Sequence, residues 1–140
     1  MSENTTIEKK PEIKWLTPGK GTYTPWGKAD GVYRYATGIN SYITPGHGGF
    51  HLSPSRMAQL PQMIKDWLRS PENGWSYDQC RGWFEEDCNW CLVVLAFPVY
   101  FTENQRESAI STCRRWLPEF PLDKYLWSHT AHWEPLPARR

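Results

Sequence analysis

The residues best suited to chemistry are one histidine placed among glycines and a run of acidic residues further along the chain. His47 lies in the stretch TPGHGGF, after Gly46 and before Gly48 and Gly49. Glycine allows positive φ angles and the close approach of another group, and consecutive amides in such a loop can hold an anion. The pattern predicts either a glycine-rich hairpin connection or a small phosphate- or carboxylate-binding loop, although it matches neither the P-loop nor the dinucleotide fingerprint.

The glycine-rich stretch runs toward a helix start at Ser53, where free backbone N–H groups favour anions. His47 or Arg56 would complete an anion site formed there. A further candidate for contact with a ligand or partner is the aromatic side chain of Trp26, which comes earlier in the chain.

The acidic run is Glu85-Glu86-Asp87, followed by Cys88. If these residues open a helix, its dipole favours the carboxylates. The four residues from Glu85 to Cys88 subtend more than a full helical turn, so at least one acid points toward the core, and we expect this to be Asp87. A carboxylate held there needs a partner, for which His47 and Arg56 are the candidates. The resulting link is either structural or, in an enzyme, a catalytic pair of His47 with Glu86 or Asp87.

Two other kinds of site are disfavoured. A cysteine hydrolase built on Cys88, His47 and Asp87 would need a reactive thiol, whereas cysteines inside helices are usually inert. A zinc site is disfavoured because Cys88-x-x-Cys91 has no second such pair in the chain. We therefore expect no metal and no cofactor.

Length and composition predict one domain with a substantial core. The chain has 140 residues, with 16 basic and 15 acidic side chains and a net charge of +1. Such a balance lacks the basic field that nucleic acid demands, so nucleic acid is disfavoured as a partner. Nine Trp, seven Tyr and five Phe predict an aromatic core, and those left exposed would suit flat ligands or protein partners.

Neither a leader nor a membrane span is predicted. Residues 1–10 contain no apolar stretch, and the apolar run Cys91–Phe97 is too short to cross a bilayer. We expect a soluble protein in the cytoplasm of a bacterial host cell, with reduced cysteines.

The order of strand-type and helix-type patterns along the chain predicts an α+β fold. Residues 1–20 are polar and aperiodic, which predicts a flexible arm before a single domain over 21–140. Short β-type runs separated by turn signals predict a three-stranded antiparallel meander, with strands at Val32–Tyr35, Ile39–Thr44 and Phe50–Leu52.

Helical periodicity follows the meander. Ser53 and Pro54 predict a helix start, followed by a turn and a helix from Pro61 to Arg69. We expect a central helix over 76–97, a helix over 102–117 that begins with a Thr102–Gln105 capping box, and irregular structure over 121–140. The fold expected is a three-stranded antiparallel sheet with about three helices on one side.

The combination of TPWG at 24–27, TPGHGGF at 44–50 and WFEEDCNW at 83–90 resembles a domain-of-unknown-function family found in phages, plasmids and other bacterial mobile elements. The resemblance spans about residues 22–120. A shorter stretch, GGFHLSP at 48–54, is similar to a phrase of the plasmid antirestriction proteins.

This resemblance implies a setting rather than a mechanism. Small accessory proteins of mobile elements most often act by binding, which implies a counter-defence inhibitor whose partner is a host defence protein or a small nucleotide-like ligand. The expected surface includes Trp26, the loop from His47 through Gly48 to Gly49, Arg56, and the corner of Glu86 and Asp87. The alternative is a small hydrolase or nuclease-like enzyme using His47 with Glu86 or Asp87.

Overall fold

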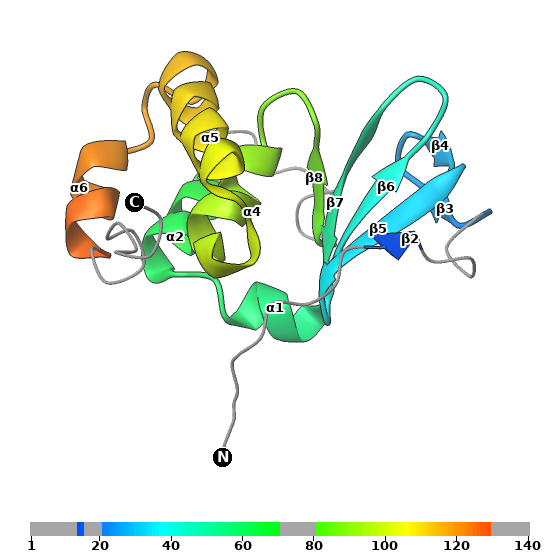
Figure 1. Ribbon diagram of the computed structural model, residues 1–140. Coiled ribbons are helices and arrows are strands. Elements are labelled where there is room, and N and C mark those ends of the chain that lie inside the picture. The colour runs from blue at the N-terminus through cyan, green and yellow to red at the C-terminus, as the bar shows by residue number, and fades with distance from the viewer. Residues whose placement is uncertain (1–13, 16–20, 71–80, 130–140) are drawn as a thin grey trace.

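The structure, a computed structural model, describes residues 14–15, 21–70 and 81–129. Within these ranges the chain forms one main antiparallel sheet, a small two-stranded sheet and a layer of helices (Figure 1). The class is α+β, as the sequence predicts.

The predicted meander forms the centre of the main sheet. Its strands are β5 (Gly31–Ala36), β6 (Ile39–Ile43) and β7 (Gly48–Leu52), paired in sequence order. The prediction of three strands is wrong, however, because β8 (Trp83–Glu85) pairs with β7 and β2 (Lys14–Trp15) pairs with β5. The sheet order is β2-β5-β6-β7-β8.

The second sheet is the hairpin of β3 (Tyr23–Thr24) and β4 (Gly27–Lys28), which carries Trp26 in its turn. Lys14 and Trp15 belong to the segment that we expected to be an arm. The other residues of 1–20 lie outside the described part of the chain.

Five α-helices and one short 3-10 helix are described. They are α1 (Pro54–Ala58), α2 (Gln62–Arg69), α4 (Trp90–Ala96), η3 (Pro98–Tyr100), α5 (Glu103–Trp116) and α6 (Leu122–Ser128). The helices lie on one side of the main sheet, and the β3–β4 hairpin lies apart from them (Figure 1).

Local signals correctly predicted the starts of α1 and α5. The Ser53 side chain accepts a hydrogen bond from the Arg56 N–H at the start of α1, and Pro54 is the first residue of that helix. The capping box of Thr102 and Gln105 at the start of α5 is present with both of its hydrogen bonds.

The central helix is shorter than predicted. Trp83, Phe84 and Glu85 form β8 rather than its first turns, because they alternate in burial and pair with β7. The expected start at Ser76 lies outside the described residues. What remains, α4, is innermost as expected: Cys91 to Ala96 are all buried, and the helix packs against β7, β8 and α5.

The prediction of irregular structure after residue 120 is also wrong, because Leu122–Ser128 is a helix. Leu122 and Tyr125 are three residues apart, which places both on one buried face. The Tyr125 hydroxyl donates to the Leu95 carbonyl over 2.7 Å and ties α6 to the central helix.

Candidate functional site

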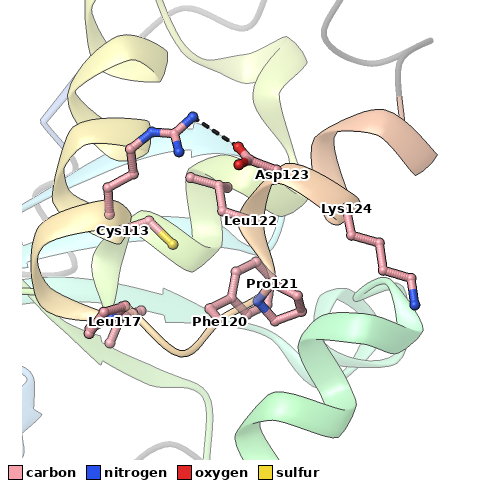
Figure 2. A pocket seen from close by; sticks show the side chains of 9 residues that line it. Cys113, Leu117, Phe120, Pro121, Leu122, Asp123 and Lys124 are labelled. Atoms are coloured by element: carbon pink, nitrogen blue, oxygen red, sulfur yellow. Dashed lines mark ion pairs between the residues drawn. The ribbon is translucent and has the colours of Figure 1, made fainter.

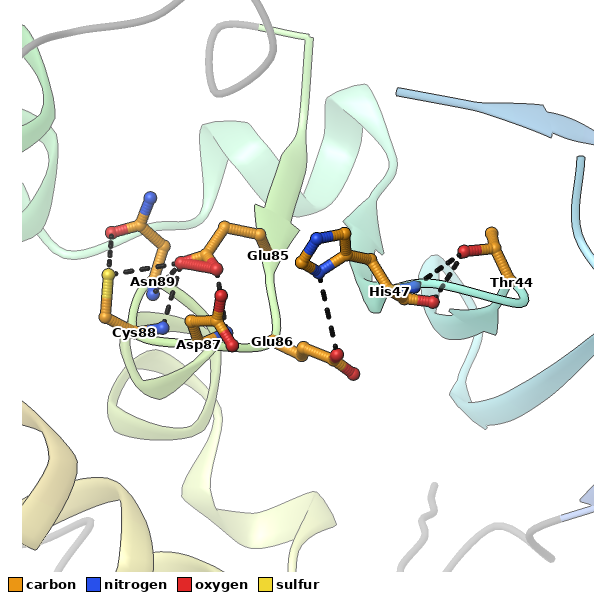
Figure 3. A network of polar contacts seen from close by, with 7 residues as sticks. All are labelled: Thr44, His47, Glu85, Glu86, Asp87, Cys88 and Asn89. Atoms are coloured by element: carbon orange, nitrogen blue, oxygen red, sulfur yellow. Dashed lines mark hydrogen bonds and ion pairs between the residues drawn. The ribbon is translucent and has the colours of Figure 1, made fainter. Parts of the chain in front are cut away.

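The turn that carries His47 is closed by Thr44. The Thr44 N–H and hydroxyl both donate to the His47 carbonyl, over 2.8 and 2.7 Å. The His47 N–H donates back to Thr44 Oγ1 over 3.0 Å (Figure 3). This N–H is therefore already paired within the turn. Of the two interpretations of the stretch, the hairpin connection describes the backbone at His47.

Gly48 and Gly49 are buried residues of β7, and neither has a positive φ. A Cβ on Gly49 would lie 2.5 Å from Trp26 Cη2 and would collide with the Phe84 carbonyl. A Cβ on Gly48 would lie 2.7 Å from the Tyr42 carbonyl oxygen. The groups that approach these two glycines closely are the protein's own neighbouring strands and Trp26. We had expected a ligand to make that approach.

The structure brings His47 and Glu86 together across two elements. His47 Nδ1 lies 3.8 Å from Glu86 Oε2, and the side chains are 54% and 52% exposed (Figure 3). The pair joins the β6–β7 turn to the end of β8, where the Glu86 N–H donates to the Gly48 carbonyl over 2.9 Å. The imidazole and carboxylate are both open to solvent.

Glu85, rather than Asp87, is the acid that turns inward. Asp87 is exposed, contrary to our expectation. The Glu85 carboxylate accepts hydrogen bonds from the backbone N–H groups of Asp87, Cys88 and Asn89, over 2.7, 2.8 and 3.1 Å (Figure 3). Burial raises the pKa of Glu85, but the hydrogen bonds from the Cys88 thiol and these amides outweigh it and hold the pKa below its usual value. Glu85 therefore shapes the turn into α4.

The Cys88 thiol is unsuited to nucleophilic catalysis. Its Sγ donates to Glu85 Oε1 over 3.1 Å. Burial, together with the hydrogen bond to Glu85 and the charge of that carboxylate, raises the pKa of Cys88 to about 12. Because the thiolate is the reactive form, this environment keeps the sulfur inert near neutral pH.

Arg56 lies at the other end of β7 from His47. Its Nε donates to the Thr37 carbonyl over 2.9 Å, and its guanidinium lies over the rings of Phe97 and Tyr100, at 5.3 and 5.1 Å. Because β7 spans about 13 Å at roughly 3.3 Å per residue, Arg56 is not brought to His47 or the acids. Its contacts anchor α1 to the helical layer.

Trp26 belongs to an aromatic cluster on the sheet face opposite the helices. Its ring lies edge-on to Trp83 with centroids 5.6 Å apart, and Trp83 also contacts Tyr42 at 5.3 Å and His51 at 4.4 Å. Burial lowers the pKa of His51, and its Nε2 donates to the Arg81 carbonyl over 3.2 Å. Sequence analysis missed this cluster because it placed Trp83 on a helix.

Backbone hydrogen bonds join three chain segments at the end of the sheet that carries His47. The Asp30 N–H donates to the Ile43 carbonyl over 2.7 Å, Ile43 pairs with Gly48, and the Gly48 carbonyl accepts from Glu86. Ile43 is 45% exposed although it is a large apolar residue. The exposed side chains of this end, which we call the sheet-end surface, are those of Asp30, Ile43, His47, Glu86 and Asp87.

Within residues 14–15, 21–70 and 81–129, no helix is long and apolar enough to span a bilayer. No three His, Cys, Asp or Glu side chains in the same ranges gather closely enough to hold a metal ion.

Comparison with known proteins gives a family without an assigned activity. Residues 19–125, well over half of the chain, match the family described as "Domain of unknown function (DUF7007)". The chain belongs to the DUF7007 family. The DUF7007 match includes the main-sheet strands from β5 to β8 and the whole sheet-end surface. No curated protein and no solved structure matches the chain.

Proposed function

We propose that this DUF7007 domain acts by binding a protein, and that the sheet-end surface makes the contact. In the mobile-element setting that the sequence resemblance implies, the partner is a host defence protein whose activity the bound domain blocks. The observation that carries the proposal is that the backbones of Asp30, Ile43 and Glu86 are joined along one hydrogen-bonded sheet end. All three side chains are exposed there, and Glu86 lies against His47.

The chemistry of this surface favours a protein over a nucleotide. Asp30, Glu86 and Asp87 are acidic and exposed, so they repel the phosphates of a nucleotide-like ligand. Small ligands also need concave sites, and two cavities that described residues of the helical layer form, of about 400 and 460 Å³, are lined by residues outside the sheet-end surface. A protein partner with Lys or Arg side chains around an apolar recess for Ile43 fits this surface.

The enzyme alternative rests on the same His47–Glu86 pair. At 3.8 Å the two groups are within ion-pair distance, but they are farther apart than the roughly 2.6–3.2 Å hydrogen bond that acid–base partners use. Both are about half exposed, whereas acid–base and electrostatic catalysis gain most of their strength in sites that exclude water. Binding is therefore the function that this geometry favours.

The test compares variants of the immobilised domain in capture from bacterial lysate, followed by pairwise binding to the purified captured protein. Glu86→Lys reverses a charge in the sheet-end surface, and Glu107→Lys makes the same change at an exposed position of α5. We expect Glu86→Lys to weaken pairwise binding at least about tenfold and Glu107→Lys less than about twofold. Equal losses in the two variants, or no loss in either, would reject the surface.

Substitution of the imidazole separates binding from catalysis. If the parent domain turns over the captured molecule and His47→Ala abolishes turnover while binding persists, the enzyme alternative is correct. Weaker complex formation by His47→Ala, with no turnover by the parent, supports inhibition by binding.

A further inference from the structure

A second candidate site lies between α5 and α6. A cavity of about 400 Å³ opens where the chain leaves α5, crosses Pro118 to Pro121 and enters α6 (Figure 2). Its volume is within the range of small-ligand sites. The lining includes none of the sheet-end residues, and Figure 1 shows α6 on the side of the helical layer remote from the sheet.

The lining of the cavity is about equally apolar and polar, and its buried apolar wall is rigid. Cys113, Phe120 and Leu122 contribute to it and are 0%, 4% and 5% exposed. Phe120 is held by ring contacts to Trp67 and Tyr125, with centroids 5.6 and 5.7 Å apart. Because the Tyr125 hydroxyl also binds the Leu95 carbonyl, α6 is fixed on the core and the cavity is formed before any ligand enters.

The rim of the cavity carries an excess of positive charge. Arg114 and Lys124 line it together with a single acid, Asp123. Arg114 Nη2 lies 3.1 Å from Asp123 Oδ1, and these side chains are 55% and 83% exposed (Figure 2). Ion pairs this exposed contribute little to stability, so the guanidinium can exchange Asp123 for another carboxylate at small cost.

We propose that this α5–α6 cavity binds a small amphipathic carboxylate. The apolar part of the ligand contacts Leu117, Pro118 and Pro121, which line the cavity and are at least partly exposed. Its carboxylate pairs with the Arg114 guanidinium, which can donate two parallel hydrogen bonds. Lys124 adds a second positive charge at the rim. The proposal concerns a site separate from the sheet-end surface and does not depend on its function.

The experiment is a titration of the ¹⁵N-labelled chain with para-toluate at neutral pH, followed by amide chemical shifts, with neutral para-toluamide as the matched probe. For a ligand of this size we expect a Kd in the millimolar range or tighter, with the shifts centred on residues 113–124. Para-toluamide should bind more weakly, because it lacks the charge that pairs with Arg114. Shifts elsewhere, or equal binding of the two probes, would overturn the proposal.

Three variants test the charge pairing. Arg114→Gln should weaken para-toluate binding by about three- to tenfold, because it removes a charge-assisted hydrogen bond. Arg115→Gln makes the same change on the next residue, whose guanidinium lies over the Trp116 ring at 5.2 Å and which does not line the cavity. It should leave the Kd within about twofold, since long-range charge effects are screened.

Asp123→Asn should tighten para-toluate binding, because it removes the carboxylate that competes for Arg114. An effect of opposite sign from Arg114→Gln excludes general damage to the fold, which would weaken binding in both variants. Weaker binding by Asp123→Asn, or an equal effect of Arg114→Gln and Arg115→Gln, would contradict the proposed pairing.

Discussion

The ring of Trp26 fills the space above Gly49. A Cβ at residue 49 would lie 2.5 Å from Trp26 Cη2, closer than real side chains approach. Trp26 in turn packs edge-on against Trp83, the neighbour of Phe84 in β8. Because residue 49 is a glycine, the Trp26 side chain of the β3–β4 hairpin can pack on the sheet. A substitution that adds one methyl group at residue 49 tests this contact.

Gly49→Ala should destabilise the domain by about 1–3 kcal/mol, because overpacking forces shifts in rigid neighbours. Here the neighbours include the Phe84 carbonyl, which is part of the β8 backbone. The measurement is the free energy of unfolding in urea. Gly46→Ala is the matched control: a Cβ there meets nothing within 4 Å, so its effect should stay within about 0.5 kcal/mol. Similar losses in both variants would show that the close approach of Trp26 and the Phe84 carbonyl does not set the cost.

Glu85→Ala should cost about 1–3 kcal/mol, because it leaves the partly buried amides of the turn into α4 without their acceptor. A second variant, Glu85→Gln, tests how the free energy of unfolding depends on pH. The folded-state pKa of Glu85 is lowered, so its charge contributes stability above the ordinary value of 4.5 and loses that contribution as pH falls through the folded-state pKa.

The difference in unfolding free energy between the parent and Glu85→Gln should therefore be largest near neutral pH and shrink below pH 4.5. Glu86→Gln, at an exposed neighbour, provides the control and should have a smaller effect. A difference for Glu85→Gln that does not change with pH would show that its carboxylate charge is not what holds the turn.

Native Cys88 should react slowly with iodoacetamide. With its pKa raised to about 12 by burial and by Glu85, the thiolate fraction at mildly alkaline pH should be at least about a hundredfold below that of the unfolded chain. Site-resolved mass spectrometry of the native and urea-unfolded protein measures the two rates. Glu85→Gln should speed the native reaction, because it removes the negative charge beside the thiol. Equal native and unfolded rates would contradict this environment and reopen the cysteine-hydrolase interpretation.

Elements whose signals are local could be predicted without the structure. Alternation with turn residues predicted β5, β6 and β7, and the pair of Thr102 and Gln105 predicted the start of α5. The continuous apolar run from Cys91 predicted a buried central helix, which is α4. In each case the decisive interaction joins residues close in sequence or depends on burial alone, so composition and spacing are sufficient.

Tertiary structure decided the rest, because the decisive partners are distant in the chain. The apolar residues at Trp83 and Phe84 also fit a helical pattern that continues into α4. Residues 83–85 form a strand because they pair with the edge of β7. Once β8 forms, its pleat and the turn after it direct Glu85 toward the backbone amides while Glu86 faces His47 and Asp87 faces solvent. Pairing across the sheet also decides what approaches Gly49, since the Trp26 ring and the Phe84 carbonyl reach that position from separate segments.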